Sequence, residues 1–264
     1  MNIFIESALI LSAYMTIMFV FAVWRRDNSI ADIAYGLGFM LVAVYLYTHQ
    51  TVTPSIRSGL VTLFISLWAL RLAYRIGRKN IGKGEDFRYA AWRKEWTKKG
   101  KIYLLLRSFL QVFLLQGLII FIVVMPGILA NTPQIDTLQW YNLVGAGLWI
   151  FGFIFESVGD TQLDRFLKLK KDGKIKANIM KTGLWKYTRH PNYFGESMQW
   201  WGLALICLMG VENSILAFAS PVLITYLLLY VSGIPLLEKR WQGDPEWENY
   251  ASRTNAFVPW IPKK

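Results

Sequence analysis

The sequence of 264 residues has little cysteine, histidine or charge: one cysteine, Cys207, two histidines, and 17% charged residues. One cysteine excludes an internal disulfide and any metal site built from several cysteines, and His49 and His190 alone make a structural zinc site unexpected. A soluble domain of this length carries about 25% charged residues. The first apolar run lacks a basic leader and a small-residue cleavage site, so we expect a retained helix rather than a signal peptide.

Hydrophobic residues make up 54% of the chain and gather in long runs. A membrane-spanning helix needs about 20 mostly apolar residues. Seven runs meet this length, at residues 3–24, 30–49, 56–76, 103–126, 138–158, 192–211 and 214–237. We therefore predict an all-α polytopic membrane protein of about seven transmembrane helices, with residues 1–264 forming a single transmembrane domain.

The distribution of Lys and Arg predicts the direction of these spans. Basic residues crowd residues 77–101 and 159–191, whereas residues 49–55, 127–137 and 211–213 contain none. The positive-inside rule then puts the N-terminus outside and the C-terminus in the cytoplasm. We expect an integral protein of a bacterial inner membrane, in contact with the lipid bilayer, with its active site facing the cytoplasm. The sequence predicts no protein partner.

A net charge of +12 could indicate a protein that binds nucleic acid. The charges lie between apolar runs and no nucleic-acid motif accompanies them, so we expect anionic lipid and a phosphate-bearing cofactor instead. The lysine-rich residues 160–181 fit either an amphipathic surface helix or part of a cofactor site. The pairs Gly36/Gly38 and Gly145/Gly147 are too short for a dinucleotide fingerprint and are expected to let helices approach closely.

Ionisable groups within spans are costly, so they face a cavity or a partner. The densest polar run, YTRHPNYFGE at 187–196, supplies Tyr187, Arg189, His190, Asn192, Tyr193 and Glu196. Pro191 suits the first turn of a helix, whose free N–H groups favour an anion. Asn192, Glu196 and Gln199 share one helical face. We predict a nucleotide site here; helix capping with interhelical hydrogen bonds is the alternative.

Three acids, Glu156, Asp160 and Asp164, are spaced four residues apart at the inner end of the fifth span. They repel each other unless cations or ligand hydroxyl and amide groups pair with them. Candidate cations are Arg165, Arg189 and Arg240. Alternatively, Asp160 and Asp164 simply leave the membrane into water.

The front half contributes Asp32 and Tyr35 in the second span. A neutral carboxyl or a tyrosine can protonate or polarise a carbonyl oxygen. Asp32 could instead form an ion pair with Arg71 or Arg75, which together with Tyr74 lie at the inner end of the third span. Positive-inside anchoring also explains these arginines. Anchoring alone does not explain the specific run GEDFRY at 84–89. We expect Tyr89, together with Arg71 and Arg75, to lie near the entrance for the substrate.

The run GLWKYTRHPNYFGE at 183–196 resembles the C-terminal signature of the steroid 5-alpha-reductase superfamily, and more closely its DUF1295 branch. The runs DIAYG at 32–36, GEDFRY at 84–89 and YASRTNAFVPW at 250–260 fit that branch too. The resemblance covers nearly the whole chain. It implies a seven-helix enzyme that takes hydride from NADPH and reduces the carbon–carbon double bond of an enone in a steroid-like or isoprenoid lipid.

The resemblance also implies site residues. The nucleotide-contacting Asn and Glu of the superfamily fall on Asn192 and Glu196, and its Asp falls on Asp160. Glu156 departs from the pattern, because the superfamily has Asn there. The catalytic Glu–Tyr pair of the superfamily has Asp32 as its nearest acid here, and Tyr74 lies about one residue from the tyrosine position.

We therefore expect Asp32, Tyr35 and Tyr74 to be catalytic. Residues from about 138–264 are expected to bind the cofactor, through Glu156, Asp160, Asp164, Arg165, Tyr187, Arg189, His190, Asn192, Tyr193, Glu196, Glu238, Arg240 and Tyr250.

Membrane methyltransferases of the isoprenylcysteine and phospholipid type share the Arg-His-Pro-x-Tyr-x-Gly-Glu pattern and bind S-adenosylmethionine. They end in a Glu-Tyr motif that Glu248-Asn249-Tyr250 resembles. Methyl transfer needs little acid–base chemistry, so the front-half Asp32, Tyr35 and Tyr74 favour the reductase. A third hypothesis is a non-enzymatic lipid-binding or transport protein; the lack of paired discontinuous helices weighs against a transporter.

Overall fold

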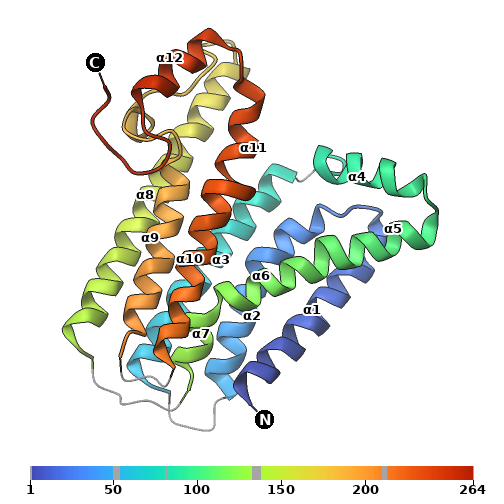
Figure 1. Ribbon diagram of the computed structural model, residues 1–264, viewed down its shortest axis with the longest axis vertical. Helices are drawn as coiled ribbons and strands as arrows, with labels where there is room; N and C mark the ends of the chain where they lie inside the picture. The colour runs from blue at the N-terminus through green and yellow to red at the C-terminus, as the bar shows by residue number, and fades with distance from the viewer. Residues whose placement is uncertain (1, 50–53, 81, 133–137, 210–212, 264) are drawn as a thin grey trace. The chain divides into compact units, whose positions relative to one another are not determined.

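The computed structural model describes residues 2–49, 54–80, 82–132, 138–209 and 213–263. These residues form helices joined by turns and loops and contain no strand, which confirms the all-α prediction (Figure 1). The α-helices are α1 (Ile3–Arg25), α2 (Ile30–His49), α3 (Ile56–Asn80), α4 (Phe87–Thr97), α5 (Lys101–Arg107), α6 (Leu115–Val123), α7 (Met125–Ala130), α8 (Trp140–Lys171), α9 (Pro191–Ile206), α10 (Ala219–Tyr226), α11 (Ile234–Glu238) and α12 (Pro245–Arg253).

Two π-helical segments and three short 3-10 helices complete the helical structure. The π-helical segments are η1 (Ser108–Leu114) and η4 (Leu227–Val231). The 3-10 helices are η2 (Gly183–Lys186), η3 (Ser214–Phe218) and η5 (Lys239–Trp241). The chain forms two compact units. Unit 1 contains Met1–Leu138 and Cys207–Ala217, and unit 2 contains Gln139–Ile206 and Phe218–Lys264.

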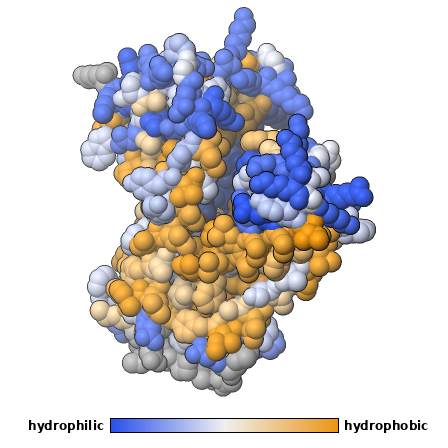
Figure 2. Space-filling view, turned by 45° about the vertical axis from the view of Figure 1, so that its right-hand side comes forward, coloured by the Kyte–Doolittle hydropathy of each residue, from blue (hydrophilic) through white to orange (hydrophobic). Residues whose placement is uncertain are grey.

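Six helical segments within the described residues are long and apolar enough to cross a membrane. They are Ile3–Arg25, Ile30–His49, Ile56–Asn80, Lys101–Val123, Trp140–Lys171 and Ser214–Trp241. They match six of the seven predicted spans and support a polytopic membrane protein. Figure 2 shows hydrophobic side chains over much of the visible surface, as a lipid environment allows.

The predicted sixth span, residues 192–211, corresponds to α9. This helix has 16 residues in the structure, fewer than the about 20 that cross a bilayer. Residues 210 and 211 lie outside the part of the chain that the structure describes. The count of seven and the orientation stay predictions.

Unit 1 has an aromatic core between α2 and α3. The ring of Phe39 meets the ring of Trp68 edge-on at 5.2 Å, and both side chains are almost fully buried. A Cβ atom on Gly36 would lie 3.2 Å from the carbonyl oxygen of Ala69, so the two helices approach closely at this point. The expectation that the first glycine pair serves helix packing is confirmed for Gly36.

Unit 2 is built on a glycine seam between α8 and α9. A Cβ atom on Gly152 would lie 2.5 Å from the carbonyl oxygen of Gly195, and one on Gly202 would lie 2.5 Å from that of Gly145. The two backbones therefore touch where a side chain would separate them. Gly147 faces open space and takes no part in the seam.

Helix α8 continues well past the predicted span. Its 32 residues correspond to about 48 Å at 1.5 Å per residue, more than the roughly 30 Å of a hydrocarbon core. Residues 160–171 therefore extend α8 rather than forming a separate surface helix. The reason is local: no proline or glycine interrupts the chain between Gly159 and Gly173, and Gly173 ends the turn with φ 69°.

Candidate functional site

Arg189 is the centre of a polar cluster in unit 2. Its Nε and Nη2 atoms donate hydrogen bonds to the two carboxylate oxygens of Glu238 at 2.8 and 3.0 Å. His190 Nε2 lies 2.8 Å from Glu238 Oε1, and the His190 ring stacks on Tyr193 at 5.4 Å between centroids. The side chain of Arg189 is 13% exposed and that of Glu238 is 20% exposed. The cluster is thus a largely buried ion pair in which one carboxylate serves two residues.

The same arginine fastens the C-terminal tail. Arg189 Nη1 donates to the carbonyl oxygens of Ala251 and Thr254 at 2.9 and 2.7 Å, and its backbone N–H donates to the carbonyl oxygen of Asn255 at 2.9 Å. All four of these donors of Arg189, a residue that we expected to bind the cofactor, are therefore engaged within the protein: Nε, Nη1, Nη2 and the backbone N–H. This arrangement gives Arg189 a positioning role in the cluster.

Tyr250 on α12 forms a further contact next to this cluster. Tyr250 donates its hydroxyl hydrogen to the carbonyl oxygen of Trp185, and Trp185 Nε1 donates to the carbonyl oxygen of Gly159 on α8 at 3.0 Å. Burial raises the pKa of Tyr250, the charge of Arg189 lowers it, and the charge of Glu238 raises it, with a net increase. The Tyr250 hydroxyl therefore stays protonated and keeps α12 tied to the segment before α9.

A cavity of about 120 Å³ lies beside this cluster. Aromatic side chains, among them Phe166 and Trp247, form much of its wall, and Asn178, Asn192 and Arg240 supply polar groups. The Oδ1 atom of Asn192 is buried and accepts no hydrogen bond from the described residues. A buried carbonyl oxygen normally has a donor, so this atom is set up to accept one from a ligand.

A second, larger pocket of about 520 Å³ adjoins this cavity and shares Phe166, Ile179 and Met180 with it. Arg165 and Lys181 contribute cationic groups to its wall. The two cavities together offer an apolar compartment with one free amide oxygen and a basic compartment next to it.

The three predicted acids of α8 differ in how deeply their side chains are buried. Glu156 and Asp160 are each only 4% exposed, whereas Asp164 is partly exposed. Glu156 Oε2 accepts a hydrogen bond from Gln199 Nε2 at 2.7 Å, which links α8 to α9. Interhelical hydrogen bonding, the alternative interpretation of this polar face, therefore accounts for the amide nitrogen of Gln199, whereas its buried Oε1 atom has no donor among the described residues.

The remaining predicted cofactor residues are more accessible. Glu196 is partly exposed on α9, and Tyr187 is 43% exposed. Arg165 and Arg240 are exposed, and the guanidinium of Arg240 lies 5.1 Å from the ring centre of Trp241.

In unit 1, the carboxylate of Asp32 accepts hydrogen bonds from two residues of α4. Tyr89 donates its hydroxyl hydrogen to Asp32 Oδ1 at 2.5 Å, and Arg88 Nη2 donates to Asp32 Oδ2 at 2.8 Å. Burial raises the pKa of Tyr89, and the charge and hydrogen bond of Asp32 raise it further. The Tyr89 O–H is thus a fixed donor. Sequence reasoning offered Arg71 and Arg75 as alternative ion-pair partners of Asp32 and missed Arg88, although the GEDFRY run carried the signal.

The loop before α4 explains how Arg88 and Tyr89 reach Asp32. Glu85 Oε1 accepts a hydrogen bond from the backbone N–H of Asn28 at 2.7 Å, and the backbone N–H of Asp86 donates to Ser29 Oγ at 2.7 Å. Arg93 Nε donates to Glu85 Oε2 at 2.7 Å. These bonds fasten the start of α4 to the turn between α1 and α2.

The other predicted front-half residues are on α2 and α3. Tyr35 packs edge-on against Phe39 at 5.0 Å, and the Tyr74 side chain is 69% exposed. Arg71 and Arg75 are partly exposed on α3. The catalytic roles of Asp32, Tyr35 and Tyr74 stay predictions. Within the described residues, no group of three or more His, Cys, Asp or Glu side chains is arranged to hold a metal ion.

Comparison of the sequence with known proteins shows the family of the chain. The family model described as "Protein of unknown function (DUF1295)" matches residues 18–254. The chain is 37% identical over 119 residues to 3-oxo-5-alpha-steroid 4-dehydrogenase 1 of Homo sapiens and 29% identical over 119 residues to that of Macaca fascicularis. Each match covers 45% of this chain and 41% of the relative.

An uncharacterized protein of Schizosaccharomyces pombe is 22% identical over 247 residues, which covers 80% of this chain and 67% of that protein. No solved structure matches. The matched region of the steroid dehydrogenases is therefore about two fifths of their length. Because the family model spans most of the sequence, the chain belongs to the steroid 5-alpha-reductase-like DUF1295 family.

Proposed function

We propose that the protein is a membrane-embedded, NADPH-dependent reductase of an enone carbon–carbon double bond in a steroid-like or isoprenoid lipid. The steroid dehydrogenase relatives support the reaction class. The observation that carries the proposal is the buried Oδ1 atom of Asn192, which lacks a donor among the described residues and belongs to a residue that lines the cavity beside the Arg189 cluster.

The residues around this atom fit a nicotinamide. The carboxamide N–H₂ of that ring would supply the donor that Asn192 Oδ1 lacks. The aromatic wall suits a flat ring, because apolar contact and stacking both favour it there. A cavity of about 120 Å³ takes one end of the cofactor only. The adjoining pocket takes phosphate groups through Arg165 in this proposal, because its other cation, Lys181, is already paired with Glu246.

Bound NADPH supplies the hydride for the reduction. The work left to the protein is to hold the ring, to exclude water and to polarise the substrate carbonyl as the double bond accepts hydride. Within unit 1 we assign polarisation to Tyr89, whose O–H would turn from Asp32 Oδ1 to the substrate carbonyl, while Arg88 keeps Asp32 paired. Arg189, His190 and Glu238 position α9, whose first turn carries Asn192.

The test is turnover by the purified full chain in nanodiscs. NADPH carrying deuterium at the transferred position is supplied with a 3-oxo-4-ene steroid and with an isoprenoid enone, and the products are analysed by mass spectrometry. The proposal expects product that has gained one deuterium and one proton. Methylated product with S-adenosylmethionine, or no reduction of either enone with NADPH, would contradict it.

A further inference from the structure

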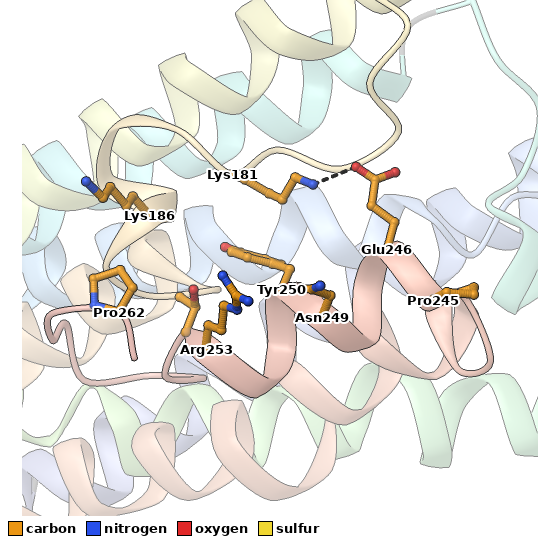
Figure 3. Close-up of a pocket in the computed structure, with 9 residues that line it drawn as sticks. Lys181, Lys186, Pro245, Glu246, Asn249, Tyr250, Arg253 and Pro262 are labelled. Carbon is orange, nitrogen blue, oxygen red and sulfur yellow. Dashed lines mark hydrogen bonds and ion pairs between the residues drawn. The ribbon is translucent and has the colours of Figure 1, made fainter. Parts of the chain in front are cut away.

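A third pocket in unit 2 borders the proposed nucleotide site, with which it shares only Lys181 and Tyr250. It has a volume of about 480 Å³ and is formed by the end of the 172–186 segment, by α12 and by the C-terminal tail (Figure 3). In Figure 3, Lys186 and Pro262 lie at one edge, Glu246 lies toward the opposite edge, and Tyr250 and Arg253 lie between them. The pocket is thus built from three chain segments, which contribute three cations, Lys181, Lys186 and Arg253.

The charges of this pocket do not cancel. Lys181 Nζ lies 2.6 Å from Glu246 Oε1, so this pair is neutral as a unit. Lys186 and Arg253 have no ion-pair partner among the described residues; the Lys186 ammonium only approaches the Tyr187 ring, at 5.8 Å. Two unpaired cations therefore line one pocket, next to the polar Asn249 side chain. This combination suits an anion with several acceptor oxygens.

The tail next to the pocket exposes large apolar side chains. Trp260 is 68% exposed and Ile261 is 76% exposed, directly before Pro262 in the pocket wall. Their positions are fixed, because the Trp260 N–H donates to the carbonyl oxygen of Tyr187 and the Lys263 N–H donates to that of Arg253, both at 2.9 Å. This tail is outside the candidate membrane spans. Exposed Trp and Ile beside basic residues are typical of a segment at a membrane interface.

We propose that this pocket binds a phosphate group through Lys186 and Arg253, and that Trp260 and Ile261 rest in the membrane interface beside it. An anionic lipid headgroup and a soluble phosphate ester present the same chemistry. The exposed apolar pair favours the lipid, because a soluble ligand gives Trp260 and Ile261 no apolar environment. The two cations that carry this proposal, Lys186 and Arg253, line neither of the nucleotide cavities, so the proposal does not depend on the reductase.

The experiment compares lipid binding by the detergent-solubilised full chain, using native mass spectrometry. The probes are phosphatidylglycerol and the zwitterionic phosphatidylcholine; inorganic phosphate, titrated calorimetrically, is the soluble probe. The variant Lys186→Ala/Arg253→Ala removes both pocket cations. Its matched control, Lys174→Ala/Lys176→Ala, removes the same charge from exposed positions of the same unit that do not line the pocket.

We expect phosphatidylglycerol to bind more tightly than phosphatidylcholine, with the affinity falling about tenfold or more in the pocket variant and little in the control, because charge-assisted hydrogen bonds are lost only in the former. The exchange Lys186→Arg/Arg253→Lys keeps both charges and should restore binding. If inorganic phosphate binds saturably, only the pocket variant loses this binding, and the two lipids bind equally, the result supports a phosphate site whose ligand is a soluble phosphate ester. Equal losses in both alanine variants, or binding of neither probe, would overturn the proposal.

Discussion

Replacing Glu238 by alanine removes the shared acceptor of Arg189 and His190. The change deletes three short contacts, at 2.8, 3.0 and 2.8 Å, and leaves the Arg189 guanidinium without a counter-charge in a site where its side chain is only 13% exposed. Arg189 also holds the carbonyl oxygens of Ala251 and Thr254, so the loss reaches the C-terminal tail.

The expected loss follows from burial. Removing one partner of a buried ion pair costs about 3–5 kcal/mol, and the 20% exposure of Glu238 puts this pair near the lower end, at about 3 kcal/mol. A change of 1 kcal/mol lowers the melting temperature of a chain of this size by about 2–4 °C. Glu238→Ala should therefore melt about 6–12 °C below the wild type.

Tryptophan fluorescence of the detergent-solubilised protein during heating measures this difference. Glu238→Gln keeps the shape and some acceptor capacity, so it should lose less. In a double-mutant cycle with Arg189→Ala, the two losses should not add, with a coupling of about 1–3 kcal/mol. The reasoning is refuted if Glu238→Ala melts within a degree of the wild type, or if the two losses add fully.

Three further predictions concern other parts of the chain. Gly152→Ala should lower the melting temperature by several degrees, because its Cβ meets a backbone oxygen at 2.5 Å, whereas Gly147→Ala faces open space and should be neutral or stabilising; similar effects of both would contradict the glycine seam. Burial raises the pKa of Asp86, but the hydrogen bonds and charge of Arg88 outweigh it and lower that pKa, so its stabilisation is present above about pH 4 and is lost as the pH falls. The stability difference between wild type and Asp86→Asn, which keeps the α4 cap, should therefore shrink in acid; a constant difference would argue against this. Tyr89→Phe and Asp32→Asn should each lower the turnover of the proposed reductase by about a hundredfold with NADPH affinity unchanged, and full turnover in either would remove that residue from the mechanism.

The helices themselves could be predicted from the sequence, because long apolar runs have few alternatives to a membrane helix. The spans differ from prediction mainly at their ends. Helix α8 runs on to Lys171 because no residue after Gly159 breaks it, and α9 has 16 residues where a full span was expected. Helix termini depend on local caps and packing, which the hydrophobic pattern does not record.

The polar cluster of unit 2 could be predicted where its residues are neighbours in sequence, whereas its function as a site stays a prediction. The run 187–196 led to Asn192, Arg189 and His190. The partners that come from distant segments were harder to predict: Arg88 reaches Asp32 only because the loop at 85–86 is fastened to Asn28 and Ser29. The engagement of Arg189 with tail carbonyl groups was also missed, since backbone oxygens leave no sequence signature.

The central claim is that the cavity at Asn192 receives the nicotinamide end of NADPH. Equilibrium binding of NADPH to the purified full chain, measured by calorimetry without substrate, tests it most directly. Asn192→Ala should raise Kd about tenfold, because the buried acceptor is lost, while Asn249→Ala, which changes an amide outside this cavity, should leave Kd unchanged. Identical Kd values for wild type and Asn192→Ala, or no NADPH binding by the wild type, would contradict the account.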